Sequence, residues 1–436
     1  MKVVSHELSG SEQALRRSAS TILDAIARDL NAWLGELKDA PAALQPRSLA
    51  SIAEGSGGVA LFFHERAAIT RDPRDLESAS EALDCMLRLM SEQASGELSL
   101  FGGIAGMGWL LQELSETPSA ASLAIDTSVG GGLSTIDEVL LEAVARTSMR
   151  DTYDLITGLT GIGLYGIRRS IEPSGALLTK AVVARLRDLA VVDESGVCWQ
   201  TPPMAAGPRS EGPFANGLVD LGLAHGVSGT ITFLAEVVRS GLPIPHAKAL
   251  LMDATRWLLS QGREGALCPS FPHAVVSSEV FAPTSRLAWC TGDLSVASAL
   301  MAAARATGND IWRRIAVAIA TNATLTPPHL TGVVDASICH GAAGIAHIFS
   351  LFSSGTGLPQ FARAAAFWFN TTLRYHQPGA GTGGYTYGDI VNGARLYVPR
   401  IGLVEGAAGI GLALMALQKK PECTWDQLFG LASVCA

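Results

Sequence analysis

The sequence predicts an all-α protein, an α/α toroid of seven inner and seven outer helices with long loops at one end. Three observations predict it: a glycine motif recurs seven times, a nearly apolar helical segment follows each copy, and a more charged helical segment lies between copies. Composition agrees, because 48% of the 436 residues are hydrophobic and only 17% are charged. Ala and Leu dominate over the β-branched residues, which argues against a long antiparallel β-protein.

The recurring motif reads small or polar residue, Gly, any two residues, Gly. Its first glycine falls at positions 55, 103, 158, 226, 292, 341 and 406. The spacings of 48 to 68 residues each fit two helices with their connections. In the fifth copy, Ser295 replaces the second glycine. Two glycines three apart at the start of a helix remove side chains from one face, so we expect neighbouring helix ends to approach closely there.

The helical segments differ in polarity. Residues 409–417, after the last motif, are apolar, whereas residues 181–188, between motifs, carry charges that suit a solvent-facing outer helix. Seven apolar helices, each followed by an amphipathic one, favour a closed ring over the alternative of an open solenoid. We expect one toroid domain over residues 20–436, with residues 1–20 as an N-terminal extension or the lead-in to the first helix.

Composition and charge exclude several classes of protein. The apolar content excludes a disordered chain, and a net charge of −8 argues against nucleic-acid binding. Residues 336–362 carry no charge, but turn residues bound a short apolar part, so we expect a buried helix and no membrane insertion. The N-terminus lacks the apolar stretch of a signal peptide. Seven widely spaced cysteines without Cys-x-x-Cys fit a reducing cytoplasm better than a disulfide framework.

Three stretches interrupt the helical rhythm: 197–216, 262–286 and 376–400. They lead into motifs four, five and seven and are predicted to be long loops, with room for short strands. Long ordered loops at one end of a scaffold commonly carry the binding surface.

If the motifs are equivalent around a ring, residues at equal offsets face a common centre. Two residues before the first glycine, motifs five and six supply Cys290 and Cys339, and His340 follows directly. Two thiolates and an imidazole are good zinc ligands, and three protein ligands leave the fourth position open, as in catalytic zinc sites. Singly, however, a buried Cys is more often a small hydrophobe, and a buried His a satisfied core group.

Such a site would suit thiol chemistry. Two thiolates weaken the metal as a Lewis acid for carbonyls, yet it could still deprotonate a fourth thiol and keep it nucleophilic. Addition of that sulfur to an activated alkene creates an enolate, which His225 of motif four could protonate. Asp154 could orient His225, or else be a helix N-cap. Arg286 could stabilise the enolate oxygen or hold the peptide backbone, or else be a loop residue capping a carboxylate.

With these residues in view, the chain resembles the lanthionine synthetase C-like family, whose cyclases close thioether rings in lanthipeptides. The resemblance runs from about residue 20 to the end of the sequence. It rests on three segments and the Gly-x-x-Gly frame: Leu223-Ala224-His225-Gly226-Val227-Ser228-Gly229, Ala288-Trp289-Cys290-Thr291-Gly292 and Cys339-His340-Gly341-Ala342-Ala343-Gly344.

The resemblance implies an α/α toroid with Zn²⁺ held by Cys290, Cys339 and His340. It implies Michael-type addition of peptide cysteine thiols to dehydroalanine or dehydrobutyrine, with His225 and Asp154 in the acid/base positions. Arg286 matches the family's site arginine. The substrate would be a dehydrated precursor peptide, with leader and core. The chain length leaves no room for a dehydratase domain, so we expect a stand-alone cyclase, with a separate dehydratase and an exporter as candidate partners.

Two departures from the family pattern lie in motif five. Thr291 stands where the family often has Tyr, and Leu294-Ser295 replaces the usual Pro-Gly. The metal ligands are unaffected, but substrate contacts near motif five are in doubt.

Three alternative functions remain open on the sequence alone. A homologue of the same fold could add glutathione to dehydroamino acids. A glycosidase would need paired carboxylates, for which Glu54 and Glu405 are the candidates, although sugar-stacking aromatics are lacking. The same two residues could instead support the site or be first-turn charges. A non-catalytic binding scaffold with a structural zinc is the third.

Overall fold

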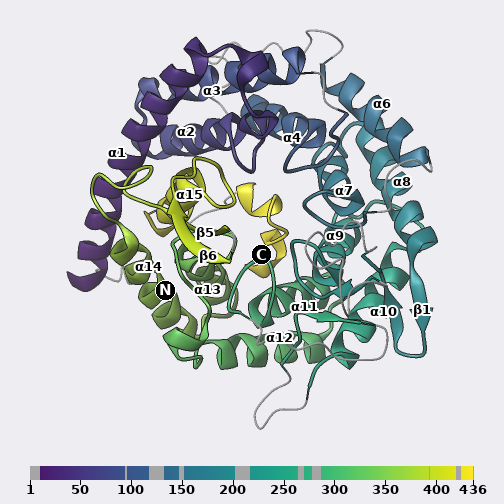
Figure 1. Cartoon of the computed structure of the whole chain (residues 1–436). Coiled ribbons are helices and arrows are strands. Elements are labelled where there is room, and N and C mark those ends of the chain that lie inside the picture. The colour runs from purple at the N-terminus through teal and green to yellow at the C-terminus, as the bar shows by residue number, and fades with distance from the viewer. Residues whose placement is uncertain are drawn as a thin grey trace, which may run out of the picture.

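The protein is described by a computed structural model covering residues 10–93, 96–116, 132–146, 152–201, 217–263, 270–276, 286–391, 393–418 and 424–435. Fourteen α-helices in these ranges form two concentric rings (Figure 1). The predicted all-α toroid is therefore confirmed.

The inner ring consists of the seven helices that follow the glycine motifs. Each begins at the residue after the first motif glycine: α2 (Ser56–Thr70), α4 (Ile104–Glu116), α7 (Leu159–Arg168), α9 (Val227–Arg239), α11 (Asp293–Thr307), α13 (Ala342–Thr356) and α15 (Ala407–Gln418). They are buried over most of their length, as their apolar sequences predict; in α15 every residue from Ala407 to Met415 is buried. All seven therefore present their N-terminal ends to the same face of the ring.

The outer ring consists of the amphipathic helices. They are α1 (Gly10–Asp39), α3 (Pro73–Glu92), α6 (Gly132–Ala145), α8 (Pro173–Leu189), α10 (Ala247–Ser260), α12 (Asp310–Ala323) and α14 (Pro359–Tyr375). Six of them follow an inner helix, as predicted. The prediction fails for α15, whose outer partner is α1, from the opposite end of the sequence. Contact of α15 with α1 and α2 closes the ring, and α1 runs without a break through residue 20.

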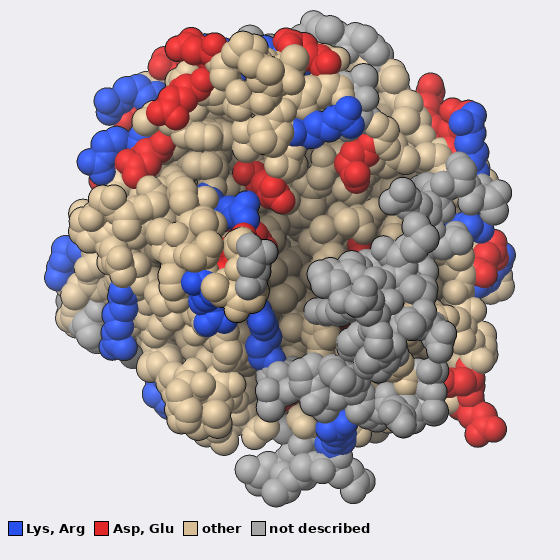
Figure 2. All heavy atoms as spheres, viewed as in Figure 1, with Lys and Arg blue, Asp and Glu red and all other residues tan. Residues whose placement is uncertain are grey.

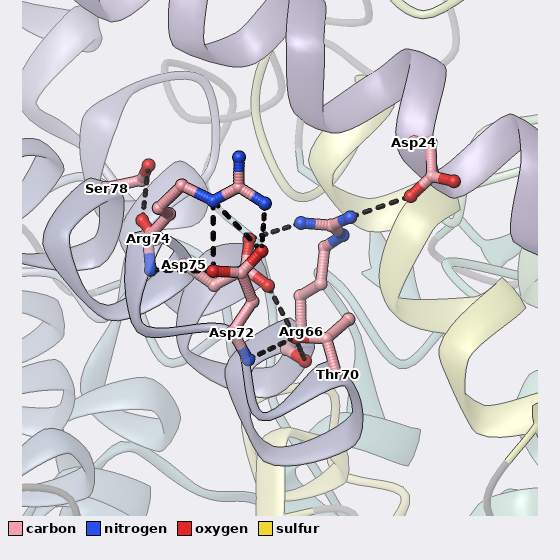
Figure 3. Close-up of polar contacts among 7 residues, drawn as sticks. All are labelled: Asp24, Arg66, Thr70, Asp72, Arg74, Asp75 and Ser78. Atoms are coloured by element: carbon pink, nitrogen blue, oxygen red, sulfur yellow. Dashed lines mark hydrogen bonds and ion pairs between the residues drawn. The ribbon is translucent and has the colours of Figure 1, made fainter.

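A polar cluster on the outside attaches α1 to its neighbours (Figure 3). Arg66 of α2 lies between two carboxylates, donating at 2.7 Å to Asp24 of α1 and also to Asp75 of α3. Thr70 donates to the second oxygen of Asp75 at 2.6 Å. Asp72 caps α3 by accepting from the amide of Arg74 at 3.0 Å. One arginine thereby links three helices at the closure of the ring.

The motif glycines have a different role from the predicted one. A Cβ placed on Gly344 would lie 1.9 Å from the carbonyl oxygen of Ile338, in the loop that enters the same helix. In five other motifs, a Cβ placed on the second glycine would lie 1.8 to 2.5 Å from the equivalent carbonyl oxygen of that motif's own entry loop. The glycines thus chiefly let each entry loop cross its own helix start, more than they bring neighbouring helices together.

Motif five departs from this pattern in both sequence and backbone. Gly292 has φ +91°, whereas the equivalent Gly226 and Gly341 have φ −129° and −101°. The entry loop therefore takes another path, which leaves room for a side chain at position 295. The Ser295 hydroxyl uses that room to accept a hydrogen bond from the amide of Leu223 at 2.6 Å.

A ring of backbone hydrogen bonds joins the entry loops. Six of the seven residues that lie two before a first glycine donate their amide to the carbonyl of their counterpart in the neighbouring motif, at 3.0–3.3 Å. The bonds run in sequence along Ile156, Ala224, Cys290, Cys339, Val404, Ala53 and Phe101. This backbone ring confirms that equal motif offsets lie at the same height around the centre.

Three two-stranded antiparallel sheets lie in the predicted loop regions: β1 (Val191–Asp193) with β2 (Gly196–Cys198), β3 (Val219–Asp220) with β4 (Ala274–Val275), and β5 (Tyr387–Val391) with β6 (Ala394–Val398). Residues 202–216, 264–269 and 277–285 of these loops lie outside the described residues. The 3₁₀ helices are η1 (Ala42–Leu44), η2 (Arg47–Ala50), η6 (Pro328–Leu330), η7 (Thr424–Gln427) and η8 (Ala432–Val434).

Residues 424–435, here called the central plug, fill the middle of the toroid (Figure 1). Trp425 stacks on His347 of α13 with ring centroids 4.4 Å apart. Phe429 packs edge-on against Trp289, whose indole N–H donates to the Phe429 carbonyl at 2.9 Å. The Ser433 carbonyl accepts from Arg305 of α11 at 3.0 Å. The core of the ring is therefore completed by a segment that the helical repeat does not predict.

The uncharged stretch 336–362 contains α13, whose first residues through Phe349 are all buried in the protein core, as predicted. Within the described ranges, we find no helix with the length and apolarity needed to cross a bilayer.

Candidate metal centre and active site

The loops entering α11 and α13 bring Cys290, Cys339 and His340 together, as the motif register predicts. The two sulfurs and one imidazole nitrogen all lie within 4.8 Å of one another, and the three residues are partly exposed. Their position is fixed by the backbone ring, in which the Cys290 amide donates to the Cys339 carbonyl at 3.2 Å. The ligand set is therefore held by backbone as well as by side chains.

The donor set fits a zinc ion. Two sulfurs and a nitrogen are the soft and borderline ligands that zinc takes in proteins, at roughly 2.3 and 2.0 Å. A hydrogen bond from the Cys339 thiol, with His340 as a second contributor, holds the pKa of Cys290 well below its ordinary value. The pKa of Cys339 is raised in turn, because its thiol is hydrogen-bonded to Cys290 and buried. The N-terminal ends of α11 and α13 add positive potential that favours anions here.

The structure also brings His225 and Asp154 together, beside the metal ligands. His225 Nδ1 and Asp154 Oδ2 lie 2.9 Å apart, and the imidazole is half exposed while the carboxylate is buried. Burial lowers the pKa of His225, but the hydrogen bond and charge of Asp154 outweigh it, so the net shift is upward. The second Asp154 oxygen accepts from the amide of Thr157 at 2.6 Å, in the entry loop and not in the helix itself.

Arg286 lies exposed at the start of the loop that leads to Cys290. Its neighbour Leu287 is fixed by a backbone hydrogen bond to Thr331 at 2.9 Å. The guanidinium charge contributes to the low pKa of Cys290. Arg286 therefore lies within electrostatic reach of the predicted ligands.

Tyr387, on β5, is a site residue that the sequence does not predict. Its ring lies 5.5 Å from that of His340, and its hydroxyl donates to Glu405 at 2.8 Å. Burial raises the pKa of Glu405 despite that hydrogen bond, and the charge of Glu54 adds to the rise. Glu405 thus lies within electrostatic reach of both Glu54 and His340. The mixed Tyr and Gly composition around Tyr387 gives no signal that it reaches the centre.

A second unpredicted group lies next to Cys290. His273 Nδ1 and the buried Thr291 hydroxyl are 2.7 Å apart, and His273 Nε2 lies 3.5 Å from the Asp220 carboxylate. Asp220, Arg286 and Asp335 each lie six residues before the first glycine of their motif. A comparison of the motifs at that position would therefore have identified Asp220 and Asp335 as candidate site residues. Thr291, which differs from the family's frequent Tyr, therefore has His273 of the preceding loop as its hydrogen-bonding partner.

The face carrying these residues is hollowed in its middle, and charged residues stand on the rim (Figure 2). A cavity of about 430 Å³ lies over motifs one to three, lined among others by Glu54, Phe101 and Thr157. Its lining includes none of the three metal-ligand candidates. This cavity therefore lies apart from the metal-ligand candidates.

Comparison with known proteins agrees with this geometry. The family model described as lanthionine synthetase C-like protein matches residues 49–429. Among solved structures, nisin cyclase superposes with a TM-score of 0.73 at 18% sequence identity, covering 94% of this chain and 97% of that one. At that identity the likeness speaks for the fold. Curated protein sequences gave no match. The motif register, the toroid and the family match together show that the chain belongs to the lanthionine synthetase C-like family.

Proposed function

We propose that the protein is a zinc-dependent lanthipeptide cyclase, with Cys290, Cys339 and His340 as metal ligands. The observation that carries the proposal is the convergence of this three-ligand group with the His225–Asp154 pair at one end of the ring. Family membership favours this function over a glycosidase built on Glu54 and Glu405. Zinc bound here would supply a positive centre at which a cysteine thiol is held as the nucleophilic thiolate.

In the proposed reaction, the sulfur of a peptide cysteine bonds to the β-carbon of dehydroalanine or dehydrobutyrine. The alkene electron pair moves towards the α-carbon and its carbonyl, giving an enolate. The α-carbon then gains one proton, which balances the proton lost by the thiol. The product is a lanthionine or methyllanthionine thioether ring, with no change in mass.

His225 is the proposed proton donor. Asp154 holds its Nδ1, which orients the ring and leaves Nε2 for the substrate. The raised pKa of His225 keeps the donor form populated at higher pH than in an ordinary histidine. Arg286 is proposed to stabilise the enolate oxygen or hold the peptide backbone, since it carries the positive charge nearest in the chain to Cys290.

The substrate would be a dehydrated precursor peptide with leader and core. A separate dehydratase would make it, and an exporter is a further candidate partner. We place the reaction in the cytoplasm, where free thiols persist. Consistent with this, the five cysteines in the described ranges are thiols, while Cys268 and Cys423 lie outside those ranges.

The test combines metal analysis with a cyclisation assay. Protein prepared without chelators is analysed for zinc and incubated with a dehydrated peptide and glutathione, and thiol alkylation followed by mass spectrometry counts unreacted cysteines. We expect stoichiometric zinc and loss of alkylation without a mass change. Cys290→Ala should lose the metal, while His225→Ala should keep the metal and lose cyclisation.

Three outcomes would contradict the proposal in different ways. Mainly glutathione adducts would support the alternative of intermolecular addition. Full activity in His225→Ala would show that His225 is not the proton donor. Wild-type protein without zinc would overturn the metal assignment.

A further inference from the structure

The β5–β6 hairpin rises beside the metal group and has two distinct faces. In its register, Tyr387 pairs with Val398, Asp389 with Leu396, and Val391 with Ala394. Paired residues share a face, and alternate residues along a strand point to opposite faces. The face that begins at Tyr387, here called the inner face, therefore continues outward through Asp389 and Leu396 to Val391.

The base of the hairpin is tied to the candidate site. The buried Asp335 accepts from the amide of Gly388 at 3.2 Å. On the inner face, Asp389 pairs with Arg400 at 2.9 Å, and the Arg400 guanidinium lies 5.7 Å from the centre of the Tyr387 ring. Tyr387 itself contacts His340 and Glu405. The inner face therefore leads directly to a candidate metal ligand.

The outer half of the hairpin exposes apolar side chains. On the inner face, Leu396 is 48% and Val391 41% exposed. On the opposite face, Ile390 is 58% and Tyr397 56% exposed. Exposed aliphatic groups gathered on a two-stranded hairpin are costly in water unless a partner covers them.

We infer that the inner face is a docking surface for the substrate peptide, which it holds through apolar side chains near the reacting cysteine. This inference rests on the proposed function and adds a specificity determinant to it. The peptide is the occupant that fits because the inner face is continuous with Tyr387 and His340, where the reacting sulfur must lie. A second copy of this chain would gain nothing from that continuity.

The strand geometry sets which substrate residues are involved. An extended chain rises about 3.3 Å per residue. Leu396 lies opposite Asp389, two residues from Tyr387, and Val391 lies four residues from it. An extended peptide whose cysteine lies beside His340 therefore brings residues two to four positions away over Leu396 and Val391. Apolar residues at those positions should bind most tightly.

The two faces of the hairpin provide a matched pair of variants. Leu396→Ser with Val391→Ser removes the inner apolar surface, and Ile390→Ser with Tyr397→Ser removes a comparable surface on the other face. Binding is measured by fluorescence anisotropy with an unreactive peptide, in which Ser replaces the cysteine and Ala the dehydroamino acid. One peptide carries Leu and another Gln at positions two to four.

The inner pair should weaken binding of the Leu peptide about tenfold and raise KM equally, with kcat little changed. It should leave the Gln peptide unaffected, and the control pair should stay within about twofold of wild type. Unchanged melting temperatures would verify folding.

Equal effects of both pairs, or of both peptides, would overturn the docking surface. So would a wild-type dimer that the inner pair dissociates. Because the peptide is unreactive, failure of the proposed function would appear separately, as binding without thioether formation by the wild-type protein.

Discussion

The amide of Cys290 donates a hydrogen bond to the carbonyl of Cys339, 3.2 Å away, although 49 residues separate the two in sequence. These two of the three predicted metal ligands therefore belong to the series of backbone hydrogen bonds that links the seven motifs. The positions of their Cα atoms are set by the fold, so the proposed metal would have only to order side chains.

Metal removal should consequently leave the toroid folded. Chelator-treated protein is expected to keep its far-UV circular dichroism and to rebind about one zinc ion per chain. Cys339→Ser should bind zinc at least tenfold more weakly, because a hydroxyl is a poor replacement for a thiolate ligand. The matched change Cys435→Ser, at a partly buried cysteine in the central plug, should bind zinc as wild type does. Global unfolding on chelation would contradict a preformed site.

Asp154→Asn should shift the pH dependence of cyclisation. The pKa of His225 is raised by its hydrogen bond with Asp154 and the charge of that carboxylate, even though burial opposes the shift. The acid form of His225 is therefore lost as pH rises through a value above the ordinary 6.5. Without the carboxylate, the loss should occur at lower pH, and kcat should fall about 10- to 100-fold. Initial rates between pH 5.5 and 9 would measure both changes. An unaltered profile would mean that another group limits the rate.

His64 should make the protein sensitive to acid. It is 5% exposed on α2, and burial lowers its pKa to about 4. The folded state therefore disfavours the protonated form, so stability is lost as pH falls from about 6.5 towards 4. The full loss is on the order of 3 kcal/mol. In His64→Leu, urea unfolding at pH 7 and pH 4.5 should show a smaller stability difference than wild type. The same change at the exposed His329 should leave the difference as it is.

Gly344→Ala should destabilise the protein, since its Cβ would lie 1.9 Å from the Ile338 carbonyl oxygen. Displacing that entry loop also moves Cys339, so zinc affinity should fall together with a loss of more than about 2 kcal/mol. Gly35, inside α1 with nothing within 4 Å, is the control. Gly35→Ala should stabilise by about 0.5–1 kcal/mol, because Ala is the better helix former. Thermal unfolding would measure both, and a tolerated Gly344→Ala would contradict the role assigned to the motif glycines.

The central plug should carry a large share of the stability. Trp425 is 1% exposed and stacks on His347. Trp425→Ala is expected to cost about 3–5 kcal/mol, which is typical of an aromatic residue removed from a core. Phe367, which is 42% exposed on the outer ring, supplies the control, and Phe367→Ala should cost under about 1 kcal/mol. Chemical denaturation gives both values. If the two substitutions lowered the free energy of unfolding by similar amounts, the central plug would be only loosely packed.

The repeat makes most of this molecule predictable. Six glycine pairs and the fifth copy, with Gly292 and Ser295, mark seven helix starts, and equal offsets are enough to locate the group formed by Cys290, Cys339 and His340. Such inference works because the repeat is physical: the same loop crosses the same helix start each time, so one register describes all copies.

What escapes prediction lies outside that register. The partnership of α1 with α15 and the insertion of Trp425 depend on contacts between distant segments that carry no repeated pattern. His273 and Tyr387 reach the site from irregular loops and a hairpin, whose course depends on tertiary contacts. The predicted role of the glycines is wrong because a sequence shows that a side chain is missing, but not which neighbouring atom requires it to be missing.

The ring is completed by its two most separated parts. Helix α1 precedes the other described helices in the sequence, yet the surface that it covers belongs largely to α15, and residues 424–435 occupy the space that the seven inner helices enclose. During translation, the growing chain must therefore carry an open arc with an apolar interior until its closing segments leave the ribosome. Contacts of such long sequence separation form slowly. Until α15 and the central plug pack against it, the exposed apolar interior makes the nascent arc prone to aggregation.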